Sequence, residues 1–148
     1  MAKMRGINQL VLELLTLLLL LCEARVLVSG RTHVHLQNKV GSDVIVHCKS
    51  KDDDLGLHTI SNEQEYQWSF KPSIFETTLF YCYVSWARAP DFSFGFEAYN
   101  FMDRFSCTGG TKGSNHDCYW RFAPDGVYLS DAETNTWNFR YPWPKPTP

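Results

Sequence analysis

The sequence has almost no excess of charge of either sign. Its 148 residues contain 14 Lys and Arg against 16 Asp and Glu, which gives a formal net charge of −2. A domain that binds nucleic acid normally carries a basic face, so this balance argues against a nucleic-acid partner. The length is that of one ordinary domain, which excludes most multidomain enzymes.

The patterns that usually hold metals or phosphates are also missing. The cysteines include no Cys-x-x-Cys pair, which argues against a zinc site. Asp52, Asp53 and Asp54 are consecutive, whereas a calcium-binding loop alternates its carboxylates along the chain. The glycine-rich stretch 108–113 lacks the spacing of a phosphate-binding loop. We therefore expect no metal and no cofactor.

No set of residues indicates a catalytic centre. His47, Lys49 and His58 are the residue types that perform acid–base cleavage of RNA. However, no nucleophile or second base signature accompanies them. We expect this segment to be a solvated charged loop after a strand, and we expect the protein to have no catalytic residues and not to be an enzyme.

Residues 1–30 have the pattern of a secretory signal peptide. Two basic residues precede a dense leucine run, and small residues follow it. A membrane span needs about 20 apolar residues, and two amides and Glu13 interrupt this run. The small residues allow cleavage after Ala24 or after Gly30. We expect the mature chain to be secreted, with no insertion into a membrane.

The rest of the chain alternates apolar and polar residues with the period of a β-strand. Ten Phe, seven Tyr and five Trp all follow residue 30, and no window there has helical spacing. This predicts an all-β fold over 31–141: a small, disulfide-stapled β-sandwich of about seven or eight antiparallel strands, with a closed small barrel as the alternative. The predicted strands lie near residues 33–37, 44–49, 66–71, 78–86, 92–99, 118–122, 127–129 and 137–139.

Proline marks one turn and the end of the domain. Pro124 and Gly126 bracket Asp125 in a strong turn signal, because proline presets φ and glycine accepts a positive φ. Four prolines follow Tyr141, and proline cannot donate to the interior of a sheet. We therefore expect residues 142–148 to be an extended, frayed tail.

Four cysteines remain after the signal peptide, which predicts two disulfides in a small secreted chain. Cys48, Cys82 and Cys118 share strand faces with apolar residues, so all three are expected to point inward. Sequence allows three pairings. We favour Cys48–Cys118 with Cys82–Cys107, because inward cysteines on separate strands would staple the core, whereas a Cys107–Cys118 bond would close only a local loop.

Six short motifs occur in order over about residues 32–139. They are His47-Cys48-Lys49-Ser50, Asp52-Asp53-Asp54-Leu55-Gly56, Trp68-Ser69-Phe70, Thr78-Leu79-Phe80-Tyr81-Cys82, Cys118-Tyr119-Trp120 and Gly126-Val127-Tyr128-Leu129. Together these motifs resemble the plant self-incompatibility S-protein family. The resemblance implies a small secreted plant protein with a signal peptide, four cysteines and a β-sandwich. Founding members of the family are stigma proteins that act as ligands for a pollen-surface receptor.

Two classes of function follow from these observations. The first is an extracellular signalling ligand, expected to be monomeric, that contacts a cell-surface receptor through loops. The second is a secreted carbohydrate-binding or defence module that uses exposed aromatics such as Tyr119, Tyr128 or Trp143. The candidate receptor contacts lie in two polar loops, 108–117 and 131–136, and are Thr108, Lys112, Asn115, His116, Asp131, Glu133 and Asn135.

Overall fold

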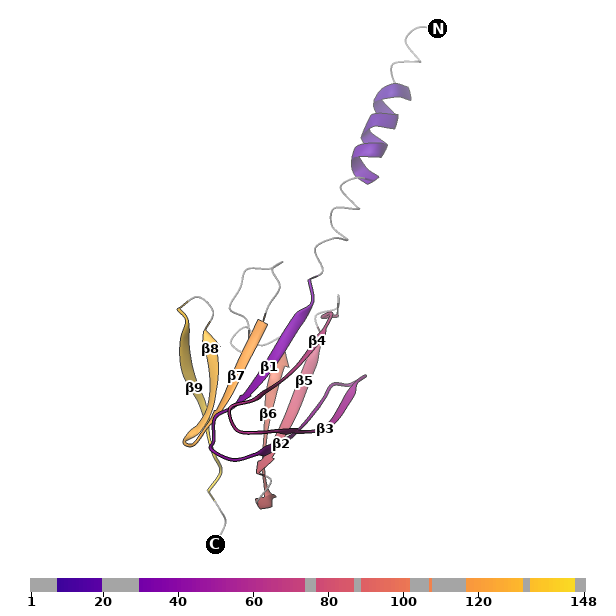
Figure 1. Ribbon diagram of the computed structural model, residues 1–148. Helices are drawn as coiled ribbons and strands as arrows, with labels where there is room; N and C mark the ends of the chain where they lie inside the picture. The colour runs from indigo at the N-terminus through magenta and orange to yellow at the C-terminus, as the bar shows by residue number, and fades with distance from the viewer. Residues whose placement is uncertain are drawn as a thin grey trace.

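The computed structural model describes residues 8–19, 30–73, 77–86, 89–101, 107, 117–131 and 134–145. Residues 8–19 form a helix that stands apart from the folded domain (Figure 1). Within the described ranges, no helix has the length and the apolar character that crossing a membrane requires.

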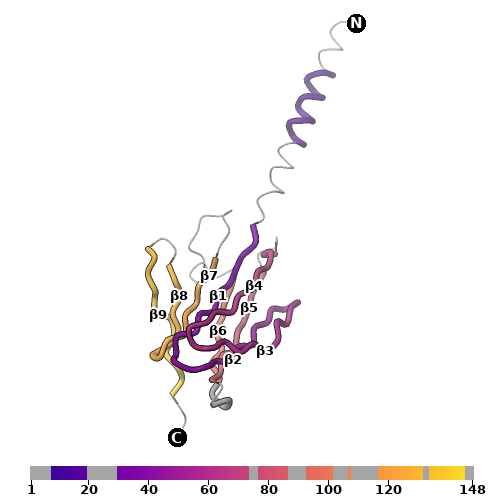
Figure 2. The backbone as a smooth tube through the Cα atoms, in the orientation of Figure 1, coloured from indigo at the N-terminus to yellow at the C-terminus, as the bar shows by residue number. Residues whose placement is uncertain are grey.

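Nine strands lie in the described residues of the domain, in two sheets. The five-stranded sheet has the order β4-β1-β7-β8-β9, and the four-stranded sheet has the order β3-β2-β5-β6. Figure 2 traces the chain from β1 to β9, which lies at an edge of the five-stranded sheet. The strands are β1 (Thr32–Asn38), β2 (Val44–Lys49), β3 (Asp54–Ile60), β4 (Glu65–Phe70), β5 (Leu79–Trp86), β6 (Ala89–Asn100), β7 (Asp117–Ala123), β8 (Gly126–Asp131) and β9 (Thr136–Pro142).

The predicted all-β sandwich is confirmed, with two differences in its strands. β3 lies partly in the segment expected to be a loop, and only Ile60 among its residues is buried. β1 and β7 pair in parallel, with Val34 opposite Cys118, whereas all pairs were expected to be antiparallel. A parallel pair requires a long crossover, and here the whole four-stranded sheet lies in that crossover.

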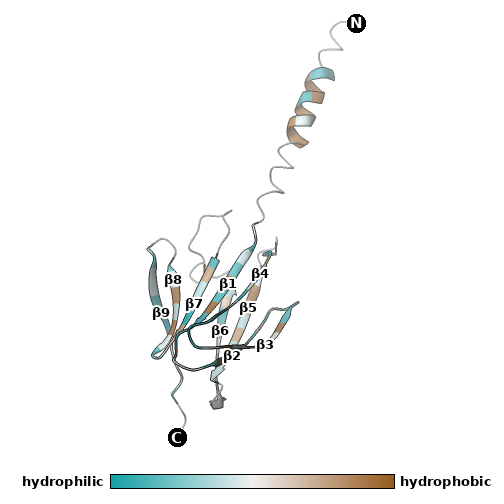
Figure 3. Cartoon of the chain, in the orientation of Figure 1, coloured by the Kyte–Doolittle hydropathy of each residue, from teal (hydrophilic) through white to brown (hydrophobic). Residues whose placement is uncertain are grey.

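The core lies between the two sheets, where the alternation of the sequence places it. Brown and teal segments occur in turn along strands in Figure 3, and buried residues alternate with more exposed ones along β1, β2 and β7. The sequence alternation fails within β6, because Ala98 and Tyr99 are both buried. A register shift between Phe80 and Tyr81 on the neighbouring strand accounts for the change. The largest fully buried side chains are Trp120, Phe122, Leu36, Val34, Val44, Val46, Val84, Val127, Asn38 and Thr32.

The disulfides join Cys48 to Cys82 and Cys107 to Cys118. The pairing favoured from the sequence, Cys48–Cys118 with Cys82–Cys107, is therefore wrong. Cys48 and Cys82 lie directly opposite each other on β2 and β5, with their Cα atoms 4.0 Å apart. Cys118 faces the core from the other sheet. Packed sheets lie about 10 Å apart, which exceeds the Cα separation that a disulfide can bridge.

Two predicted features near the C-terminal end have different outcomes. The Pro124–Gly126 turn is confirmed, since Ala123 pairs with Gly126 to close the β7–β8 hairpin. The expected frayed tail differs at its first residue, because β9 extends to Pro142, and residues 146–148 lie outside the described residues. Trp143 then packs beside Trp86 and donates from Nε1 to the carbonyl oxygen of Ala123 at 2.7 Å. An indole that covers the end of the core explains why the chain stays attached there.

Candidate functional site

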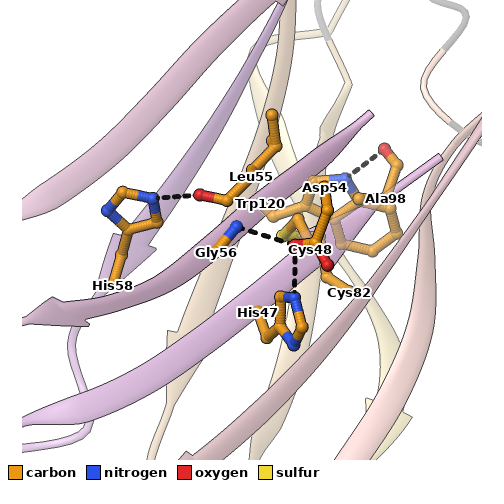
Figure 4. Close-up of a disulfide and its surroundings, with 9 residues drawn as sticks. All are labelled: His47, Cys48, Asp54, Leu55, Gly56, His58, Cys82, Ala98 and Trp120. Atoms are coloured by element: carbon orange, nitrogen blue, oxygen red, sulfur yellow. Dashed lines mark hydrogen bonds and ion pairs between the residues drawn. A yellow bond between two sulfur atoms is a disulfide. The ribbon is translucent and has the colours of Figure 1, made fainter. Parts of the chain in front are cut away.

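The β2–β3 hairpin is braced by one carboxylate. Asp54 Oδ1 lies 2.6 Å from His47 Nε2 and accepts the Gly56 backbone N–H at 2.9 Å (Figure 4). Two hydrogen bonds lower the pKa of the Asp54 carboxyl below its ordinary value. The bond with His47 has the larger effect, and the bond from the Gly56 N–H has the smaller one. Gly56 has a φ of +75°, and the strand register shifts at this point. The brace therefore fixes a β-bulge in β3.

The consecutive aspartates form the tip of the same hairpin. The Ser50 hydroxyl oxygen accepts the backbone N–H of Asp52 at 3.3 Å and that of Asp53 at 3.0 Å. The Ser50 N–H donates to the Asp53 carbonyl oxygen at 2.8 Å. The residues from His47 to Gly56 therefore form hydrogen bonds that stabilise the turn between β2 and β3. Within the described part of the chain, no group of three His, Cys, Asp or Glu side chains is arranged to hold a metal ion.

The bulge leads into a solvent-exposed apolar surface on the outer face of the four-stranded sheet. Leu57 lies opposite His47, and His47 lies opposite Tyr83. Leu57 is 73% exposed and Tyr83 is 43% exposed. The Tyr83 ring packs edge-on against Tyr81, and Lys49 Nζ lies 6.0 Å from its centre. We call this surface, made by His47, Lys49, Leu57, Tyr81 and Tyr83, the Leu57 face.

The outer face of the five-stranded sheet has a different character. One row of side chains crosses all five strands, and each member lies opposite the next in the strand register. Gln37 donates to Glu65 Oε2 at 3.1 Å, and Arg121 Nη2 donates to Gln37 Oε1 at 3.1 Å. Tyr128 packs edge-on against Phe139, which is 51% exposed. We call Glu65, Gln37, Arg121, Tyr128 and Phe139 the transverse row.

Aromatic and histidine side chains flank the transverse row on the same face. Tyr119 stacks on His35 with ring centres 4.2 Å apart, and His35 Nδ1 lies 2.6 Å from Glu65 Oε1. Partial burial, and then the charges of Asp117 and Glu65, raise the pKa of the Tyr119 phenol. The Trp137 ring lies under the Arg121 guanidinium at 3.7 Å. This face therefore combines stacked rings with paired hydrogen-bonding groups.

The candidate receptor contacts fall only partly in the described structure. Thr108, Lys112, Asn115, His116 and Glu133 lie outside the described residues. Asp131 is the last residue of β8, and Asn135 lies between β8 and β9, directly before Thr136. Asp131 Oδ1 accepts the Thr134 N–H at 3.2 Å, and Asn135 has a φ of +52°. Asp131, Thr134 and Asn135 all fall within the segment 131–136 that the sequence predicts as a loop.

The aromatic residues expected to form a carbohydrate platform do not all lie on one surface. Tyr119 and Tyr128 lie on the outer face of the five-stranded sheet, where they are half-buried. Trp143 is different, because it packs at the end of the core against Phe94 and Phe122. Sequence reasoning missed Phe139 and Trp137, which continue the aromatic surface on β9. The sequence shows that Trp137 and Phe139 alternate with polar residues. It does not show which face of that strand the second sheet covers.

Comparison with known proteins gives a consistent assignment. The family described as plant self-incompatibility protein S1 matches residues 33–143. The chain is 34% identical to S-protein homolog 2 of Arabidopsis thaliana over 119 residues, which is 79% of this chain and 70% of that protein. It is 30% identical to self-incompatibility protein S1 of Papaver rhoeas over 106 residues, which is 70% of this chain and 71% of that protein.

A solved structure supports the fold independently. It belongs to the self-incompatibility protein homologues, described as a widespread family of small, highly stable, secreted proteins from plants. The two share 17% sequence identity with a TM-score of 0.54, over 79% of this chain and 93% of the other. With a family match over most of the domain and relatives at 30–34% identity, this secreted, all-β chain belongs to the plant self-incompatibility protein S1 family.

Proposed function

We propose that the protein is an extracellular signalling ligand, without catalytic activity, that binds a cell-surface receptor through the Leu57 face. The observation that carries this proposal is the exposure of Leu57, 73% open to solvent on a braced hairpin. Burying a leucine side chain at an interface yields roughly 1.5–3 kcal/mol. Leu57 stays in water in the monomer, so folding does not gain this free energy. The free energy therefore remains available for binding a partner.

The surroundings of Leu57 fit a protein interface. Tyrosine is enriched among the residues that contribute most to binding, and Tyr81 and Tyr83 lie on the same face as Leu57, with His47 between Leu57 and Tyr83 in the strand register. Lys49 and Asp54 supply opposite charges at the margin, where charges steer association more than they add affinity. The disulfide from Cys48 to Cys82 cross-links β2 and β5, the strands that carry His47 and Tyr83, so the surface is held rigid before binding; Figure 4 shows this disulfide near His47.

The loops at 108–117 and 131–136 are the second part of the proposal. Loops on a rigid sandwich commonly carry recognition residues, and those proposed here are Thr108, Lys112, Asn115, His116, Asp131, Glu133 and Asn135. A ligand with one apolar face and two polar loops would obtain affinity from the face and selectivity from the loops.

Plant protoplasts, whose walls have been removed, provide the test. Labelled protein secreted by plant cells should bind protoplasts saturably, and protease treatment of the protoplast surface should abolish that binding. Leu57→Ser should weaken binding at least about tenfold, because a fully buried leucine contributes more than 1.4 kcal/mol. Phe139→Ser is the matched control, since it removes an exposed apolar side chain from the other sheet. Equal binding by Leu57→Ser and the parent protein would contradict the proposal.

A further inference from the structure

The transverse row has more hydrogen-bonding capacity than its own members use. The Arg121 guanidinium carries five N–H donors, and Gln37 accepts only from Nε and Nη2. Glu65 receives bonds on both oxygens, yet each carboxylate oxygen has two acceptor sites. These planar groups are aligned across neighbouring strands, so their remaining donors and acceptors lie in one line on an outer surface.

Aromatic rings continue that line at its other end. Tyr128 lies opposite Arg121 on one side and Phe139 on the other. Phe139 remains 51% exposed at an edge strand, and the partly exposed Trp137 is on the same strand. Four gaps between adjacent strands, each about 4.8 Å, make the row roughly 19 Å long. The row is therefore an extended strip with polar groups at one end and rings at the other.

The composition of the strip excludes several kinds of ligand. The core of a protein interface is depleted of charge, whereas Glu65 and Arg121 occupy the strip itself. A nucleic acid or an acidic polysaccharide requires a surplus of positive charge, but Arg121 is accompanied by the carboxylates of Glu65 and Asp117. A lipid surface requires a continuous apolar face with basic residues, and polar side chains interrupt this one.

We propose that the transverse row binds a neutral oligosaccharide of the kind found in plant cell walls, independently of the receptor contact. Paired amide, carboxylate and guanidinium groups match the adjacent hydroxyls of a sugar ring, since each can donate or accept two bonds in one plane. Aromatic rings such as Phe139 and Tyr128 cover the apolar C–H face of a sugar. The strip supplies both kinds of contact along one line, as an extended chain of sugars requires.

Titration of the isotopically labelled secreted protein with neutral glucan oligosaccharides tests this proposal by NMR. Cellohexaose and a xyloglucan oligosaccharide should shift the backbone signals of β7, β8 and β9 in a saturable manner. Phe139→Ala should weaken binding about five- to tenfold, the loss expected for one aromatic contact. Tyr128→Phe keeps the ring and should retain most of the affinity. Leu57→Ser, on the opposite sheet, should bind as the parent protein does.

Three results would overturn the proposal. The first is the absence of saturable shifts with either neutral oligosaccharide. The second is binding of polygalacturonate alone that added salt abolishes, which would identify a site for polyanions. The third is shifts centred on the Leu57 face. Because no receptor is present in this titration, its outcome is independent of the protoplast experiment.

Discussion

Asn38 and Ile60 are 22 residues apart in sequence, and the Asn38 amide donates to the Ile60 carbonyl oxygen at 2.8 Å. Asn38 is completely buried at the end of β1. Its amide also donates to the Ser42 carbonyl oxygen at 2.8 Å, and its Oδ1 accepts the Val40 N–H at 3.1 Å. One side chain thus holds the β1–β2 turn against the end of β3, where the chain passes between the two sheets.

Replacement of Asn38 by alanine should be strongly destabilising. The change leaves two carbonyl oxygens and one N–H without their partner, and each buried unsatisfied group costs about 1–3 kcal/mol. We expect Asn38→Ala to lower the free energy of unfolding by about 3 kcal/mol, measured by urea denaturation. Asn62→Ala removes a comparable bond to the Gly41 N–H at an exposed turn, so its cost should be about 1 kcal/mol or less. Equal losses in both variants would contradict the role of burial.

The two disulfides should contribute unequally to stability. Cys48 and Cys82 are 34 residues apart, whereas Cys107 and Cys118 are 11 apart. Loop-closure entropy then gives about 4 kcal/mol for the first bond and about 3 kcal/mol for the second. Double replacement of Cys48 and Cys82 by alanine should also open space in the core and widen that difference. Chemical denaturation measures both losses, and peptide mapping without reduction should recover these two cross-linked pairs.

The hairpin brace should make stability depend on pH in the acid range. The bond from His47 lowers the pKa of Asp54 in the folded chain, relative to about 3.9 in the unfolded chain. The unfolded state therefore binds the proton more readily. The stabilisation is fully present above about pH 4 and is lost as the pH falls through the lower folded pKa. Asp54→Asn should flatten the dependence of unfolding free energy on pH in this window, while Asp53→Asn, which removes one charge and leaves the brace intact, should not.

Gly126 should tolerate no side chain. A Cβ at this position would lie 2.6 Å from Phe139 Cε2 and would also meet the carbonyl oxygen of Tyr141, which belongs to the backbone and cannot move aside. Gly126→Ala should therefore cost about 3 kcal/mol, from overpacking and backbone strain together. Gly41 has a φ of +89° with open space around it, so Gly41→Ala should cost only about 1 kcal/mol. Thermal unfolding of the two variants compares these costs.

Most of the strands could be predicted from the sequence because each has one face in the core. Val44, Val46 and Cys48 show this directly, since their alternation with polar residues matches their burial. β3 could not be found in this way, because Ile60 is its only buried residue and its charged start resembles a loop. Leu57 was missed for the same reason, and with it the surface that we propose for the receptor.

The order of the strands is the information that the sequence pattern does not contain. Alternation shows that Cys48, Cys82 and Cys118 point inward, but two inward cysteines can lie on neighbouring strands or on opposite sheets. The structure places Cys48 and Cys82 on neighbouring strands. In the same way, alternation identifies Gln37, Arg121 and Tyr128 as outward residues, and only the register brings them into one row.

The parallel pairing of β1 with β7 has a consequence for how the chain acquires its structure during export. The four-stranded sheet is formed by residues 44–100 alone, from consecutive or nearly consecutive strands. β1 emerges first, but its partner β7 emerges only after residues 39–116 have entered the secretory lumen. Contacts of such long sequence separation form slowly. Until β7 emerges, the edge of β1 that pairs with β7 has no native partner, and an unpaired strand edge is exposed to wrong strand pairing and aggregation.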